Sequence, residues 1–126
     1  MKTSAFFGSL FAVSLLALGN IGCGGPSYEH TQVSDVSAGE LPASISLSSI
    51  SMEIGAATKA IIKPYDDDGE IMSGDVTSDD PQVLEIAPGL SDHEYMFMAR
   101  TVGNTQVRFT AGGGVVAIAH VTISAQ

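Results

Sequence analysis

The sequence predicts an all-β fold, a sandwich of about seven to eight short strands. Short segments after residue 43 alternate polar and apolar side chains, which is the pattern of a strand with one buried face. Glycine, proline and aspartate interrupt these segments about every 8–12 residues, a spacing typical of β-sandwiches. No window carries apolar residues at helical spacing without an intervening glycine or proline.

The first strands are predicted over residues 44–48 and 50–54. Polar and apolar residues alternate in both segments, but the alternation slips by one residue between them. We therefore expect two consecutive strands joined by a kink. Residues 58–65 form the next predicted strand, in which Ala60 and Ile62 face the core while Lys59 and Lys63, on either side of them, face water.

An Asp-Asp-Asp-Gly turn ends that strand, and five further strands follow it. They are predicted over residues 73–78, 83–87, 94–101, 105–111 and 115–124. Three consecutive glycines separate the last two strands and predict a hairpin. The alternation places the following residues between two sheets: Ile62, Val76, Ile86, Phe97, Val107, Phe109, Val121 and Ile123.

The N-terminus has the pattern of an export signal. Lys2 precedes an apolar segment over residues 5–18, a length expected of a secretory signal rather than a membrane span. Cys23 is the only cysteine, so it has no disulfide partner within the chain. The residues Ile-Gly-Cys that end the segment are similar to the lipobox of bacterial lipoproteins. This resemblance implies cleavage before Cys23 and attachment of lipid to its sulfur.

These patterns divide the chain into three parts. Residues 1–22 are predicted to be the lipoprotein signal peptide, and residues 23–42, rich in glycine, proline and serine, a lipidated flexible tether. Residues 43–126 are predicted to form the β-sandwich domain. The chain left after cleavage, about 100 residues, is the size of one domain.

Charge and residue chemistry exclude several functions. The net charge is −9, and the few lysines and arginines are scattered, which argues against nucleic-acid binding. The three histidines fall in the expected tether (His30), a loop (His93) and a strand (His120), and no catalytic motif accompanies them. We therefore predict no enzymatic activity, no catalytic residues and no cofactor.

The acidic run over residues 66–70 is the best candidate for a metal site. Asp66, Asp68 and Glu70 surround a glycine, and a sandwich would bring Asp92 from a neighbouring loop towards them. Aspartate and glycine are also ordinary turn residues, and the spacing does not fit an EF-hand. We expect a solvated turn, with a calcium site as the alternative.

Four segments resemble one known family. They are residues 50–55 (ISMEIG), 75–86 (DVTSDDPQVLEI), 99–103 (ARTVG) and 105–123. Together they are similar to the bacterial immunoglobulin-like domain, group 2, which occurs in invasin- and intimin-like adhesins and other surface proteins. The resemblance implies an immunoglobulin-like β-sandwich. Val76 stands where the family usually has tryptophan.

The anchor and the resemblance together predict a non-enzymatic binding or structural module of the cell envelope. We expect an outer-membrane lipoprotein facing the periplasm or the cell surface, with a secreted or periplasmic protein as the alternative. Its expected partners are the membrane, through the lipid, and an envelope protein or a surface glycan. Two other functions stay open: a subunit of an envelope complex that docks by β-strand addition, and a small enzyme or inhibitor using the acidic loop end.

Overall fold

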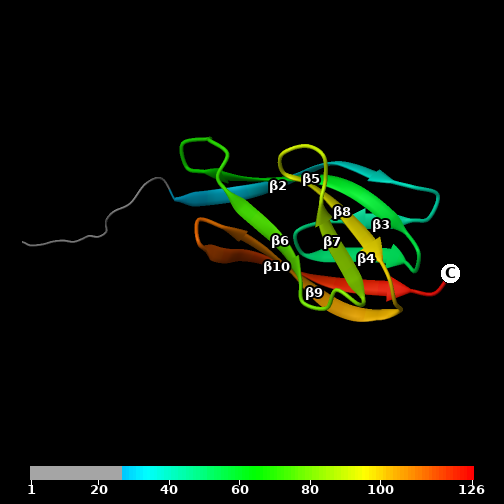
Figure 1. Ribbon diagram of the computed structural model, residues 1–126. Coiled ribbons are helices and arrows are strands. Elements are labelled where there is room, and N and C mark those ends of the chain that lie inside the picture. Colours follow the sequence, from blue (N-terminus) through cyan, green and yellow to red (C-terminus); the bar gives the residue numbers. More distant parts are fainter. Residues whose placement is uncertain (1–26) are drawn as a thin grey trace, which may run out of the picture.

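The computed structural model describes residues 27–126 and confirms the all-β prediction (Figure 1). Two sheets of five and four strands pack face to face as a sandwich. The signal peptide, Cys23 and the first residues of the expected tether lie outside the described residues. The described part of the chain forms nine strands: β2 (Tyr28–Ala38), β3 (Ala43–Ile45), β4 (Ser49–Glu53), β5 (Ala57–Asp66), β6 (Gly74–Ser78), β7 (Leu84–Pro88), β8 (Glu94–Ala99), β9 (Gly103–Ala111) and β10 (Gly114–Ser124).

The strand order determines which edges are open. The larger sheet has the order β3-β4-β10-β9-β6, and the smaller has the order β2-β5-β8-β7. Strand β10 pairs in parallel with β4, and all other neighbours pair antiparallel. The edges of the sandwich are therefore β3 and β6 in one sheet, and β2 and β7 in the other.

The core lies between the two sheets, where the alternation predicted it. Phe97 in the smaller sheet and Phe109 in the larger are almost fully buried. Strand β10 buries every second residue near its end, so one of its faces belongs to the core. Seven of the eight predicted core residues are buried, and Ile86 on the edge strand β7 is partly exposed.

Strand β2 corrects the predicted tether and the predicted domain boundary. Residues 28–38 were expected to be flexible, but they form the longest edge strand and pair with β5 from Tyr28 opposite Asp66 onwards. The sandwich therefore includes residues 28–38, which precede the expected boundary at residue 43. The sequence of β2 shows only a weak apolar pattern, because an edge strand buries few side chains. In β2 only Val33 packs against the core among the described hydrophobic side chains.

The two ends of the described chain lie at opposite ends of the sandwich (Figure 1). Tyr28 is paired beside the end of β5, whereas Ser124 at the end of β10 is paired with Glu53, just before β5 begins. Ten residues of β5 separate these places, a length of about 30 Å. Residues 27–126 contain no helix long and apolar enough to cross a membrane.

Candidate functional site

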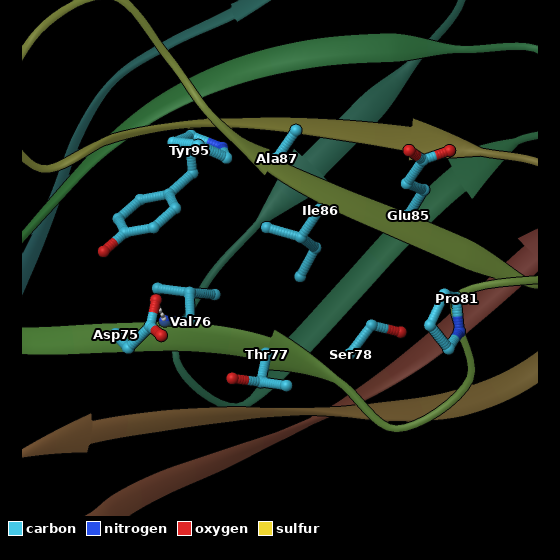
Figure 2. Close-up of a pocket in the computed structure, with 10 residues that line it drawn as sticks. Asp75, Val76, Thr77, Ser78, Pro81, Glu85, Ile86, Ala87 and Tyr95 are labelled. Atoms are coloured by element: carbon cyan, nitrogen blue, oxygen red, sulfur yellow. Dashed lines mark hydrogen bonds between the residues drawn. The ribbon is translucent and has the colours of Figure 1, made fainter.

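A groove of ≈ 410 Å³ lies between the edge strands β6 and β7, where the two sheets part (Figure 2). Val76 and Ile86 point towards each other across it and form an apolar floor. Tyr95 of β8 and Asp75 of β6 stand together at one end, while Glu85 and Pro81 lie at the other. The groove therefore combines an apolar middle with polar ends, as many ligand sites do.

The turn between β6 and β7 closes one end of the groove. Asp80 organises this turn: its carboxylate accepts the N–H of Gln82, and its carbonyl accepts those of Val83 and Leu84. Arg108 forms two hydrogen bonds to the Asp79 carboxylate, at 2.8 and 3.2 Å, which fix the start of the turn against β9. The segment between the predicted strands over residues 73–78 and 83–87 thus carries the chain from one sheet to the other.

The hydrogen-bond phase of β7 decides which backbone groups face the groove. Gly89 donates to Glu94, and Val83 accepts from Arg100, so odd-numbered residues of β7 face β8. The N–H and C=O groups of the even-numbered residues point away from the sheet. Leu84 donates its N–H to Asp80, and Pro88 has none. Ile86 is therefore the residue of β7 with both a free N–H and a free C=O at this edge.

Strand β6 is protected at the opposite side of the groove. Asp79 donates to Gln106, so the backbone groups of Val76 face away from β9. The Asp75 carboxylate accepts the Val76 N–H at 2.8 Å, a bond drawn in Figure 2. The central outward donor of β6 is thus occupied, as is common at edges that avoid pairing.

Charge is distributed unevenly along the groove. Glu85 forms an ion pair with Arg100, whereas Asp75 has no cation within ion-pair distance among residues 27–126. Burial of the Tyr95 side chain, and in addition the negative charge of Asp75, raise the pKa of the Tyr95 hydroxyl above its ordinary value. The Asp75–Tyr95 end therefore combines an unpaired anion with a neutral hydroxyl.

The acidic run forms the turn after β5. Asp66 is buried, and its carboxylate accepts the N–H groups of Asp68 and Glu70, both at 2.9 Å. The carboxylates of Asp66, Asp67 and Asp68 come within 4.8 Å of one another. Of the other predicted candidates, Glu70 and Asp92 do not belong to this group. The Asp66 carboxylate thus bonds the backbone of its own turn, and the expected approach of Asp92 to the acidic run stays a prediction.

The histidines belong to separate parts of the sandwich. His30 on β2 stacks on Tyr65, with ring centroids 5.0 Å apart. His93 has a positive φ of 63° and accepts the Ile62 N–H through its carbonyl. His120 lies in β10, in the strand expected for it, and is exposed. The sequence did not indicate the groove, because the groove depends on which strands lie at the edges of the sheets.

The fold is shared with domains of a bacterial surface protein. The crystal structure of domains 4 and 5 of the S-layer protein SbsC matches with a TM-score of 0.50 at 16% identity, over 71% of this chain and 54% of that one. Domains 5–6 of the same protein match with a TM-score of 0.54 at 19% identity, over 79% and 45%. The chain thus spans about half the length of these fragments.

No protein-family model and no curated protein matches the chain. The similarity to SbsC domains establishes a common two-sheet fold. At the level of the fold, this similarity agrees with the expected immunoglobulin-like β-sandwich. Membership of group 2 of that family is part of the proposed function.

Proposed function

We propose that this protein is a lipid-anchored, non-enzymatic module of the bacterial cell envelope, built on an immunoglobulin-like domain of group 2. The fold that it shares with S-layer domains supports a structural role, since those domains come from a surface-layer protein. The Ile-Gly-Cys sequence ending at Cys23 supports the anchor. Outer-membrane residence is the location we propose, because Gly24 stands where an inner-membrane retention signal would place aspartate.

The start of β2 is the observation that carries this proposal. Only five residue steps separate Cys23 from Tyr28, so a lipid on Cys23 would hold the sandwich within about 18 Å of its attachment point. The predicted tether of about 20 residues would have allowed a far longer reach. The link between Cys23 and β2 is short, and Tyr28 and Ser124 lie at opposite ends of the sandwich. Both observations support a module that is attached to the membrane at one end.

Replacement of Cys23 by serine tests the anchor. The thiolate is the nucleophile that accepts the diacylglyceryl group, and a hydroxyl is much weaker. Cys23→Ser should abolish incorporation of labelled palmitate and release the protein from the membrane fraction, because several acyl chains each contribute about 0.8 kcal/mol per buried methylene. Wild-type protein without label, or label retained in the Cys23→Ser protein, would contradict the anchor. Recovery of wild type in the inner membrane would contradict the proposed location.

A further inference from the structure

We propose that the β6–β7 groove binds an extended peptide segment of a partner protein, which pairs with Ile86 and places a basic residue beside Asp75. The inference goes beyond the proposed function, because it depends on the sandwich and not on the lipid. It identifies the edge at which strand addition takes place and the chemistry of the segment that is added.

The backbone of β7 limits the added segment to a short contact. Ile86 offers one N–H and one C=O at the edge, and a single residue in an antiparallel strand can bond both groups. The Leu84 N–H is already bonded to Asp80, and Pro88 has no N–H. Addition to β6 is disfavoured, since the Asp75 carboxylate occupies the Val76 N–H. The segment therefore extends the smaller sheet at Ile86.

The same register assigns the side chains of the segment. The residue opposite Ile86 has its side chain on the same face as Ile86, so it enters the groove against Val76 and should be apolar. The residue two positions earlier lies opposite Pro88, and Pro88 is paired with Tyr95. That position therefore faces the end of the groove formed by Tyr95 and Asp75.

The charge at that end selects a cation. Asp75 has no ion-pair partner among the described residues, and the nearby Tyr95 hydroxyl is neutral at ordinary pH. Glu85 at the other end is already paired with Arg100. The chain as a whole carries a net charge of −9, which favours the approach of a basic segment. The recognised pattern is a lysine or arginine followed two residues later by an apolar residue.

Three synthetic peptides test the direction and the chemistry of binding. Each is an acetylated, amidated polythreonine segment with a central valine. The first carries lysine two residues before the valine, the second carries it two residues after, and the third repeats the first with N-methylvaline. Binding to the mature lipidated protein in detergent micelles is followed by amide NMR. The first peptide should shift the Ile86 amide, and the other two should bind about fivefold more weakly.

Two variants of the protein separate a specific contact from general charge. Asp75→Asn keeps an oxygen to accept the Val76 N–H, so the fold is retained, but it should weaken the first peptide about threefold. Asp92→Asn makes the same change of charge in the exposed β7–β8 turn and should leave the affinity unchanged. Equal binding of the three peptides, equal effects of the two variants, or no shift at Ile86 would each overturn the proposal. Cys23→Ser protein should bind as wild type does, so failure of the anchor is distinguishable.

Discussion

The two sides of the sandwich at which its edge strands lie differ in how well they close the core. On one side β2, eleven residues long, covers the edge of β5, and Val33 and Leu41 pack against the core there. On the other side β6 and β7 are five residues each and leave a groove between the sheets. A strand with few apolar residues thus closes one side of the sandwich, while two strands with buried residues leave the other side accessible.

The two sides also avoid strand pairing by different means. Strand β2 is interrupted by register shifts near Tyr28 and Ser37, and Asp35 has a positive φ of 51°, which bends its free edge. Strands β6 and β7 instead use a side-chain cap from Asp75 and a proline at position 88. The irregularities of β2 thus lie near both of its ends, whereas the Asp75 cap and Pro88 on the groove side leave the backbone of Ile86 free.

Loss of a core residue next to β6 should have the largest effect on stability. Phe109 is almost fully buried and is paired with Val76, so Phe109→Ala should lower the free energy of unfolding by about 3–5 kcal/mol. Val33→Ala on the β2 side should cost about 1 kcal/mol, because Val33 is only partly buried. Urea denaturation of both variants measures the difference. Equal losses would show that β2 contributes as much to the core as the strands at the groove.

A smaller effect is expected at the turn that holds the start of β2. Asp66→Ala removes the acceptor of two N–H groups and should cost about 1–2 kcal/mol in the free energy of unfolding. The backbone of Asp67 donates to Ser27, so exchange of the first amides of β2 should accelerate as well. Asp92→Asn, in a different turn, serves as the control. Unchanged amide exchange in β2 would show that the Asp66 turn does not stabilise the start of this strand.

The same turn gives a prediction for calcium. Asp66 already bonds its own backbone, and ordering the adjacent carboxylates around an ion costs conformational entropy. We expect no saturable calcium site below about millimolar concentration. Occupancy at 100 times a dissociation constant would stabilise the fold by about 2.7 kcal/mol, which thermal melting would detect. A stabilisation of that size, absent from Asp66→Asn/Asp68→Asn protein and from sodium chloride of matched ionic strength, would establish a metal site.

The smallest effect concerns the groove at alkaline pH. Burial, and then Asp75, raise the pKa of Tyr95 in the folded state above its value in the unfolded chain. The folded state therefore holds the proton more tightly. Stability is unaffected below the unfolded pKa of about 10 and falls as the pH rises from there towards the folded value. Tyr95→Phe should flatten this decline, as measured by denaturation between neutral and alkaline pH. An unchanged dependence of stability on pH in the Tyr95→Phe protein would show that the Tyr95 hydroxyl is exposed to water in the folded state.

The sequence predicts those parts of the fold in which alternation and burial coincide. Strands β4 and β10 bury alternate residues, and their patterns are visible without a structure. Strand β2 was missed because its polar residues lie at an edge and its pairing with β5 depends on distant residues. Long-range pairing of this kind leaves only a weak local signal.

The candidate site was less predictable than the fold. The Asp66 turn could be identified from its composition, but the groove depends on which strands become edges. The free backbone groups of Ile86 follow from a hydrogen-bond phase that residue types do not encode. The three carboxylates that come within 4.8 Å of one another are adjacent in the sequence, Asp66, Asp67 and Asp68, so their grouping follows from the turn alone.

The opposite placement of Tyr28 and Ser124 has a mechanical consequence. A load applied between a membrane anchor before β2 and the far end of β10 would pull β2 and β10 along their own axes. The hydrogen bonds joining β2 to β5, and β10 to β4 and β9, would then be loaded in shear and share the force. Strands pulled sideways would lose their bonds one at a time. The sandwich is thus oriented to bear tension along its length.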